Sequence, residues 1–540
     1  MGTVVYLIFL PFICLVNVLS YGYALDADPI VSLPAGLVRG RTVSFRGIDV
    51  DQFLGIPFAE PPLGQLRFVK PVPKKPWEGL IQANDWGPIC SQKGKNSTED
   101  CLYLNVFVTS SATNDTKNGK NKLRPVMVWI HGGAFLRGSA NFPDNFDGTI
   151  LTAIHDVIIV TINYRLGPLG FLYLPENGIP GNMGLWDQKL ALEWVKDNII
   201  KFGGDPGRVT VFGESAGGLA ISAHLVSPYS KGLFRNAVLQ SGAFYTSKRL
   251  MGPNVPKEFL KEINCTQIDQ LQSCLSSYQF GQNEAADTLT FAPIVDHDFL
   301  LDVPMNLINN HSVDSSINIF LGAIEYEGAA KLAAEIDPVL FDPVNPKNLT
   351  LSLVRKVLST RSDPYSLDYL MNLYFSNADP NNSTELRLIL SKVIGDILIT
   401  CPTYVYGRDL ILNGQASVYA YYLTQKPIKS INNFPPPDKI WLPPTHADDD
   451  PFVFGYPLST VEYHTKEEVI VSFIMMESWT NFAKKDKPGS LGHKKWPSWK
   501  KLESGTISYP TMEFNSKKIG HFETSAVEFC FNHFPFPTES

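Results

Sequence analysis

The feature that most constrains the fold is a serine placed between a buried strand and a helix. The apolar run at residues 209–212 leads directly into Gly213-Glu214-Ser215-Ala216-Gly217, and an apolar helical run follows at 219–226. A serine on such a sharp turn has a strained backbone and an exposed hydroxyl, and the flanking glycines keep neighbouring chains clear. The bare pattern is weak in a chain with 40 glycines, and the alternative is a structural serine in a tight turn. Its position between strand and helix favours Ser215 as a nucleophile.

Apolar strands and amphipathic helices alternate along the rest of the chain. Residues 125–130 and 157–162 are almost entirely apolar, which is typical of strands buried on both faces. Residues 185–202 carry apolar side chains at helical spacing, and further strands are expected at 236–240, 317–324 and 417–423. This alternation predicts an α/β fold with a large, mostly parallel central sheet covered by helices. Functional residues then belong at the carboxyl ends of the strands.

A glycine-rich segment follows the strand expected at 125–130. In His131-Gly132-Gly133-Ala134-Phe135, small consecutive residues allow the backbone to approach a substrate closely and to direct N–H groups at it. The helix that starts near Ala216 presents N–H groups and its positive dipole end to the same place. A generic glycine turn is the alternative.

The amino terminus predicts export. Residues 4–19 are almost all apolar, and Gly22 and Ala24 supply the small residues of a signal-peptidase site. We therefore expect a signal peptide at 1–24, with an uncleaved anchor as the alternative. No later stretch is judged apolar enough to span a bilayer, and residues 534–540 resemble neither a lipid-anchor tail nor a retention signal. The expected product is secreted, extracellular and without a membrane anchor.

Cysteines and glycosylation sequons agree with export. Cys14 lies in the signal peptide, and an even number of cysteines remains, which in an exported chain indicates disulfides. Six cysteines allow 15 connectivities, of which the simplest pairs close neighbours: Cys90–Cys101, Cys265–Cys274 and, by remainder, Cys401–Cys530. Sequons, predicted sites of glycosylation, occur at Asn96, Asn114, Asn264, Asn310, Asn348, Asn381 and Asn382.

Composition argues against several classes of partner. A net charge of −7 gives no electrostatic footprint for nucleic acid or an anionic membrane. The sequence has no metal-ligand cluster, phosphate-binding loop or nucleotide fingerprint, so we expect no metal and no cofactor. It does not predict an oligomeric state.

Taken together, these motifs resemble those of a type-B carboxylesterase of the cholinesterase/carboxylesterase family, specifically a secreted insect esterase. Residues 53–59 (FLGIPFA) and 99–105 (EDCLYLN) match that family, and the likeness extends to Cys530. The resemblance implies an α/β-hydrolase fold with insertions, formed by one domain at 25–540. It also implies an oxyanion hole made by the N–H groups of Gly133, Ala134 and Ala216, and the same three disulfide pairs.

The resemblance also indicates the base and the acid of a catalytic triad. With an acid near residue 327, the chain order serine, acid, histidine excludes His131, His155 and His224. His446 lies in a loop after 417–423 and matches the family's base, although Ala447 stands where that family usually has glycine. His521 is the rival. Glu327, in a segment that closes the strand at 317–324, matches the triad acid, with Glu325 as the alternative. Glu214 and the pairs Arg67–Glu99 and Arg165–Asp187 are expected to be structural.

These expectations describe a hydrolase of small to medium hydrophobic esters, such as xenobiotics, odorants, pheromones or hormone-like esters, that works through an acyl-enzyme. Its only expected partner is a small-molecule ester. Acetylcholine is disfavoured because the segment from Cys90 to Cys101 is short and lacks a tryptophan for a cation–π contact. A juvenile hormone esterase is an alternative, but such enzymes tend to have glutamine at the position of Glu214. The non-enzyme alternative is a catalytically silent adhesion or ester-binding protein of the same fold.

Overall fold

The computed structural model describes most of the chain. The described residues are 28–93, 97–119, 122–142, 146–244, 255–267, 270–280, 291–329, 341–342, 344–359, 366–428, 430, 441–459, 463–491, 494–518, 520–522 and 524–533. The signal peptide expected at 1–24 lies outside these residues, as does the sequon at Asn96.

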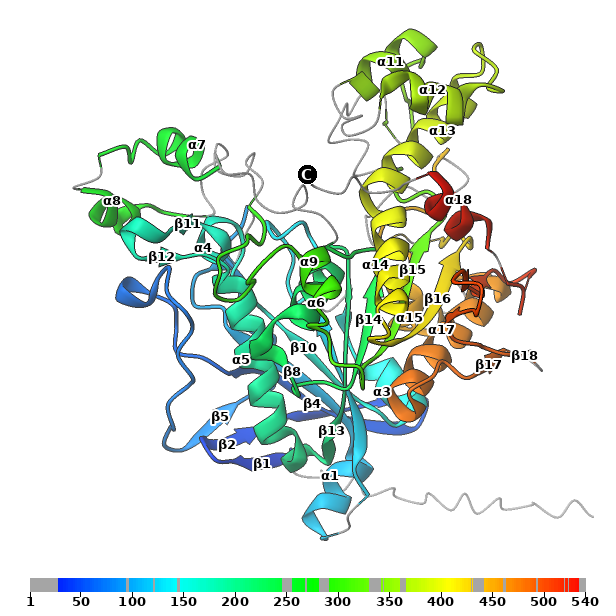
Figure 1. The fold of residues 1–540 in the computed structure, drawn as a ribbon. Coiled ribbons are helices and arrows are strands. Elements are labelled where there is room, and N and C mark those ends of the chain that lie inside the picture. The colour runs from blue at the N-terminus through cyan, green and yellow to red at the C-terminus, as the bar shows by residue number, and fades with distance from the viewer. Residues whose placement is uncertain are drawn as a thin grey trace, which may run out of the picture.

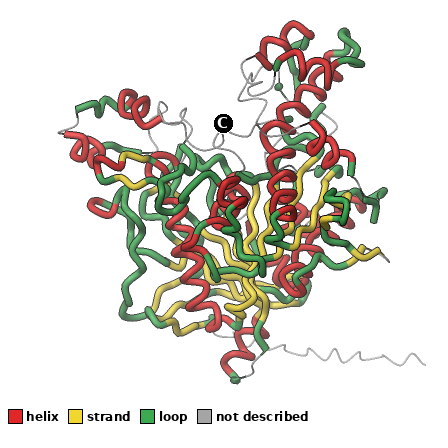
Figure 2. The backbone as a smooth tube through the Cα atoms, in the orientation of Figure 1, coloured by secondary structure: helices red, strands yellow, loops and turns green. Residues whose placement is uncertain are grey.

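A ten-stranded mixed sheet forms the centre of the molecule (Figures 1 and 2). Its spatial order is β21-β16-β15-β14-β13-β9-β10-β8-β4-β3, with parallel pairing from β21 to β10 and antiparallel pairing from β10 to β3. The strands are β3 (Arg41–Phe45), β4 (Ile48–Pro57), β8 (Tyr103–Thr109), β9 (Arg124–Ile130), β10 (Ile158–Ile162), β13 (Gly204–Glu214), β14 (Asn236–Gln240), β15 (Asn318–Ile324), β16 (Ser417–Leu423) and β21 (Thr511–Phe514). A small separate sheet contains β1 (Ile30–Leu33), β2 (Gly36–Arg39) and β5 (Leu80–Gln82).

Helices cover both faces of the large sheet, so a hydrophobic core lies on each side of it (Figure 1). The larger core lies between the sheet and helices α5 (Met183–Asn198), α6 (Ala216–Val226) and α14 (Cys401–Leu412). The other lies between the sheet and helices α3 (Thr149–His155), α15 (Asp450–Val453) and α17 (Lys466–Lys485). Every residue of β9, β10 and β14 is buried, as expected of central strands covered on both sides. The parallel part of the sheet therefore has the architecture that the alternating pattern predicts.

A helical lobe projects beyond the sheet (Figure 1). It is formed by α11 (Leu351–Ser359), α12 (Leu367–Phe375) and α13 (Ser383–Gly395), which share a small core of their own. A π-helical turn, Asp396–Thr400, joins α13 to α14, so that one helical run extends over Ser383–Leu412. This run is long and apolar enough to cross a membrane, contrary to the expectation that no later stretch would be. However, 72% of its most apolar window is buried inside the protein, as in the core helix of a globular domain.

Other short elements connect these layers. The helices are α1 (Ser110–Lys117), α4 (Gly167–Phe171), α7 (Val255–Glu262), α8 (Leu271–Ser277), α9 (Pro304–Asn309), α16 (Tyr456–Ser459) and α18 (Ser525–His533). The two-residue strands are β6 (Ile89–Cys90), β7 (Ser97–Thr98), β11 (Tyr173–Leu174), β12 (Ile179–Pro180), β17 (Ser490–Leu491), β18 (Lys494–Lys495), β19 (Lys500–Lys501) and β20 (Ile507–Ser508).

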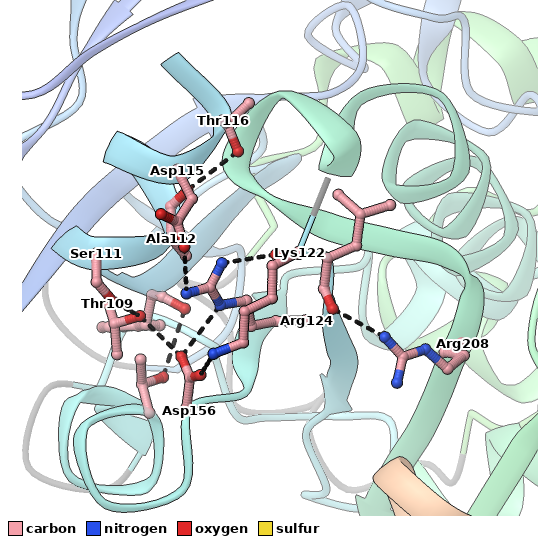
Figure 3. A network of polar contacts seen from close by, with 12 residues as sticks. Thr109, Ser111, Ala112, Asp115, Thr116, Lys122, Arg124, Asp156 and Arg208 are labelled. Atoms are coloured by element: carbon pink, nitrogen blue, oxygen red, sulfur yellow. Dashed lines mark hydrogen bonds and ion pairs between the residues drawn. The ribbon is translucent and has the colours of Figure 1, made fainter. Parts of the chain in front are cut away.

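A polar network holds the amino end of β9 in place (Figure 3). The buried guanidinium of Arg124 pairs with Asp115 at 3.0 Å and with Asp156 at 3.3 Å, and it donates to the carbonyl of Lys122 at 2.6 Å. These contacts join α1 and the turn after α3 to the first residue of the strand. Because β9 ends at Ile130, the network lies at the edge opposite to the glycine-rich segment. Its role is therefore structural.

Three disulfides connect the six cysteines: Cys90–Cys101, Cys265–Cys274 and Cys401–Cys530. These are the three pairs expected from the sequence: two pairs of close neighbours and one long-range pair. The third joins the start of α14 to α18. The sequon asparagines within the described residues are all exposed: Asn114, Asn264, Asn310, Asn348, Asn381 and Asn382.

Candidate active site

Ser215 occupies the turn between β13 and α6, and its backbone has the strain that the sequence predicts. It has φ 54° and ψ −118°, a positive φ that residues other than glycine rarely adopt. A Cβ at Gly217 would lie 1.9 Å from the carbonyl oxygen of Ile130, and one at Gly213 would lie 2.5 Å from the same oxygen. Neighbouring β9 therefore leaves room for glycine alone at both positions. The turn presents the Ser215 hydroxyl at the carboxyl end of the sheet.

The ring of His446 lies between Ser215 and Glu327. Its Nε2 is 2.8 Å from Oγ of Ser215, and its Nδ1 is 2.6 Å from Oε2 of Glu327. Glu327 follows β15 and His446 lies in the loop after β16, and a bridge between Tyr326 and Thr445 places these two segments side by side. Three residues distant in sequence thus form one hydrogen-bonded series.

The Glu327 carboxylate is fixed by further donors. It is buried, and its Oε1 accepts hydrogen bonds from the Ser241 hydroxyl at 2.6 Å and from the Ile324 backbone N–H at 2.7 Å. A Cβ at Gly395 would lie 2.8 Å from Cβ of Glu327, so the end of α13 packs directly against this residue. With one oxygen held by these donors, the other is directed at His446.

Glu214 is close to the same histidine. Its Oε1 lies 3.1 Å from Nε2 of His446, and its side chain is 5% exposed. A carboxylate can only accept hydrogen bonds, whereas a neutral Nε2 accepts the hydrogen bond that the Ser215 hydroxyl donates. The sequence predicts a structural role for Glu214, and the structure places its carboxylate beside His446.

The glycine-rich segment folds back on itself beside the serine. Gly133, Ala134 and Phe135 have positive φ values of 111°, 57° and 60°. The Gly133 carbonyl accepts the N–H groups of the residues at 136 and 137, both at 3.1 Å, which closes a tight turn. A Cβ at Gly132 would lie 3.1 Å from Cβ of Ser215. The segment therefore lies against the Ser215 turn, from which Ala216 begins α6.

Three consecutive aspartates beneath the site were not singled out from the sequence. Asp448, Asp449 and Asp450 are all buried. Burial raises the pKa of Asp448 to about 7 and that of Asp449 to about 6, and it raises the pKa of Asp450 well above its ordinary value. The Gln240 amide donates to both Asp449 at 3.1 Å and Asp450 at 3.2 Å. In the sequence, the sign that these acids are buried is the apolar run that follows them directly, at residues 451–454.

The rival histidine has other contacts. Nδ1 of His521 is 2.9 Å from Oε2 of Glu513, and its side chain is half exposed. The two pairs expected to be structural are formed: Arg67 with Glu99, and Arg165 with Asp187 at 2.7 Å. No group of three metal-ligating side chains is present within the ranges that the structure describes.

The sheet topology, with a strained serine at the turn after its central strand, defines an α/β-hydrolase. Comparison with known proteins gives the family. The carboxylesterase family model matches residues 27–529, so the chain belongs to the carboxylesterase family and is a serine carboxylic ester hydrolase.

Curated relatives cover nearly the whole chain. It is 32% identical to an acetylcholinesterase of Bungarus fasciatus, over 93% of this chain and 86% of the relative. It is 31% identical to acetylcholinesterase-1 of Trittame loki, over 92% of this chain and 93% of the relative.

Proposed function

We propose that the protein hydrolyses carboxylic esters through a Ser215–His446–Glu327 triad and an acyl-enzyme intermediate. The observation that carries this proposal is the hydrogen-bonded series in which His446 contacts Oγ of Ser215 at 2.8 Å and Oε2 of Glu327 at 2.6 Å. Glu327 accepts the Nδ1 proton, which fixes the tautomer that leaves Nε2 free to act as a base.

The proposed reaction proceeds in two halves. His446 takes the proton of Ser215 as Oγ attacks the ester carbonyl, and the carbonyl electron pair moves onto oxygen. The tetrahedral intermediate collapses, the protonated His446 gives its proton to the leaving alcohol, and the acyl group stays on Ser215. Water then repeats the sequence with His446 as its base and releases the acid.

The proposed oxyanion hole is made by the N–H groups of Gly133, Ala134 and Ala216. Positive φ values at the first two turn the backbone at the place where it passes Ser215, and Ala216 begins α6. Donors held by the fold require no reorganisation when negative charge develops on the substrate oxygen.

We propose small to medium hydrophobic esters as substrates. The two relatives are named acetylcholinesterases, but the Cys90–Cys101 segment here is short and has no tryptophan to bind a quaternary ammonium group. Glu214 argues against juvenile hormone as the dedicated substrate. Turnover of an ester panel graded in acyl and alcohol size, with acetylthiocholine and a juvenile hormone analogue included, tests the substrate class.

We further propose that residues 25–540 form one secreted domain released from a signal peptide at 1–24. Three disulfides and the exposed sequons support export. Expression in a secretory cell should place active protein in the medium, with a new amino terminus near Leu25 and a mass that falls after glycan removal. Retention in the membrane fraction with residue 1 still present would contradict this proposal.

The enzymatic proposal is tested by replacing the nucleophile. Ser215→Ala should reduce ester turnover by at least about 10⁴-fold, because the residual rate comes only from binding and the oxyanion hole. Ser472→Ala is the control, since that buried hydroxyl on α17 donates to the Phe452 carbonyl outside the series. An organophosphate should label the wild type at Ser215 alone. Turnover retained in Ser215→Ala would refute the triad, and a stable wild type without turnover would favour the silent ester-binding alternative.

A further inference from the structure

We propose that Gln92 is a positioning residue for the oxyanion hole, because it fixes the Gly132–Gly133 peptide through Gly138. The inference rests on the proposed role of the Gly133 N–H. Gln92 lies in the segment closed by the Cys90–Cys101 disulfide, outside the triad and outside the glycine-rich turn.

The amide of Gln92 holds the backbone of Gly138 from both sides. Its Oε1 accepts the Gly138 N–H at 2.9 Å, and its Nε2 donates to the Gly138 carbonyl at 2.8 Å. The second Nε2 proton goes to the Cys90 carbonyl at 3.0 Å, and the side chain is buried. Both donors of the amide and its acceptor oxygen are therefore used, which specifies one orientation of Gly138.

Gly138 in turn packs against the peptide that carries the proposed oxyanion donor. It has φ 110°, and a Cβ there would lie 2.4 Å from the Gly132 carbonyl oxygen and 2.5 Å from Nδ1 of His131. His131 Nδ1 donates to the same carbonyl at 2.8 Å, and burial lowers the pKa of His131 to about 4, so the ring is neutral. The ring stacks on Tyr164, whose hydroxyl donates to the His131 carbonyl at 2.8 Å.

The geometry of a peptide bond converts this packing into an effect on catalysis. In a planar trans peptide, the carbonyl oxygen of Gly132 and the N–H of Gly133 point in opposite directions. A contact that fixes the Gly132 oxygen therefore also fixes the direction of the Gly133 N–H. Glycine backbone rotates readily, so without such contacts the N–H would lose its alignment with the developing oxyanion.

The disulfide provides a firm base for this side chain. Gln92 is two residues from Cys90, and its own carbonyl accepts the Ser97 hydroxyl at 2.9 Å within the same segment. Asparagine at this position is shorter by one methylene, about 1.5 Å along the chain. It therefore cannot reach both polar groups of Gly138 from the same backbone.

Two glutamine variants separate positioning from general stability. Gln92→Met keeps the volume but removes the hydrogen bonds, and Gln92→Asn keeps the amide but shortens it. Gln415→Met is the matched control, because buried Gln415 also binds backbone groups by its two amide ends, the Val313 N–H at 3.0 Å and the Ile308 carbonyl. All three variants are compared by Tm, by kcat and KM for an aryl ester, and by the inhibition constant of an alkyl trifluoromethyl ketone.

The ketone reports on the oxyanion hole itself. Ser215 Oγ adds to its carbonyl carbon, the serine proton passes to His446, and the carbonyl electron pair remains on oxygen as an oxyanion. Tight inhibition of the wild type that is lost in Ser215→Ala tests the proposed function independently of Gln92.

In Gln92→Met and Gln92→Asn, kcat should fall by about 10- to 100-fold with KM changed less than about threefold, because the misaligned donor acts in the transition state. The ketone should bind more weakly by a similar factor. Gln415→Met should lower Tm and leave both quantities within about twofold of wild type. The proposal is overturned if the Gln92 variants lose only Tm, as the control does. Where Gln92→Met does not accumulate as folded protein, Gln92→Asn alone decides.

Discussion

At the scale of single residues, the site depends on the different partners of the two His446 nitrogens. Nδ1 faces a carboxylate that is held by two other donors, whereas Nε2 faces a hydroxyl and the carboxylate of Glu214. Each ring nitrogen therefore has a carboxylate neighbour, and Nε2 also has the proposed nucleophile. In the proposed reaction, Nε2 first accepts the Ser215 proton and then gives it to the leaving alcohol.

Replacing this histidine should remove activity without unfolding the protein. His446→Ala should reduce kcat by at least about 1,000-fold, because Nε2 of His446 is the proposed base and contacts Oγ of Ser215. His521→Ala is the matched control and should stay within about twofold of wild type, since His521 pairs with Glu513. Turnover of an aryl ester by both variants, with Tm as the check on folding, decides the assignment. If His521→Ala loses activity and His446→Ala retains it, the assignment of His446 as the base is wrong.

The buried aspartates should affect the pH dependence of stability. Burial raises the pKa of Asp448 to about 7, above its value of about 3.9 in an unfolded chain. Since the folded state keeps a proton that the unfolded chain releases, Asp448 lowers stability as pH rises from about 4 to about 7. Asp448→Asn removes this penalty, and its amide can still contact the Ser430 hydroxyl and the Thr445 N–H, the present partners.

Thermal unfolding of wild type and Asp448→Asn at pH 5 and pH 8 tests this expectation. The difference in Tm, variant minus wild type, should be more positive at pH 8 than at pH 5 by about 1–3 °C. An equal difference at both pH values would mean that Asp448 is ionised in the folded protein throughout this range.

At the scale of elements, the segment from His131 to Gly138 is built from close backbone contacts. A Cβ at Gly133 would lie 2.1 Å from the Arg137 carbonyl oxygen, and the φ of 111° is one that side chains rarely adopt. Any substitution at Gly133 therefore displaces the backbone of the segment. With a charged side chain at this position, the effect of the charge on turnover could not be separated from the effect of that displacement.

Gly133→Ala should reduce kcat by at least about 100-fold, the usual cost of one lost oxyanion donor. Gly232→Ala is the control, because Gly232 has φ 74° but no atom within 4 Å of an added Cβ. Gly232→Ala introduces the same kind of backbone strain. This variant should lower the free energy of unfolding by about 1 kcal/mol and leave turnover unchanged. The measurements are kcat and the free energy of unfolding for both variants. Wild-type kcat in Gly133→Ala would show that this segment does not contact the reacting carbonyl.

The sequence predicts the elements whose pattern is local. The central strands β14 and β16 begin and end where their apolar runs do. In contrast, β13 begins five residues earlier than expected, at Gly204, because the ladder continues across a bulge where no apolar pattern exists. The helix expected at 185–202 is divided into α5 and a 3₁₀ turn, Ile199–Phe202. The lobe of α11–α13 was not anticipated.

The same distinction holds within the site. Ser215 is recognisable because its strained turn requires nearby glycines. Glu327 and His446 are 119 residues apart, so their contact follows from strand order and was expected only through the family resemblance. Gln92 and Asp448 act through contacts between loops that have no sequence period, and for this reason the sequence did not indicate them.

At the scale of the whole molecule, the three disulfides constrain very different lengths of chain. Cys401–Cys530 spans 129 residues and joins α14 to α18, whereas Cys265–Cys274 spans nine residues and ends within α8. In the chain-entropy account, a disulfide stabilises the protein by restricting the unfolded state, and longer loops give the larger effect.

Replacing both cysteines of each pair by serine should therefore destabilise the protein unequally. The loop lengths predict that the loss of Cys401–Cys530 costs about 2 kcal/mol more than the loss of Cys265–Cys274. Urea unfolding of the two double variants measures this difference, with turnover per titrated active site as the control for native geometry. None of these four cysteines belongs to the hydrogen-bonded series of Ser215, His446 and Glu327, so turnover at 25 °C should stay within about twofold of wild type. Equal losses of stability would contradict the entropic account for this fold and would indicate that contacts in the native state dominate both bridges.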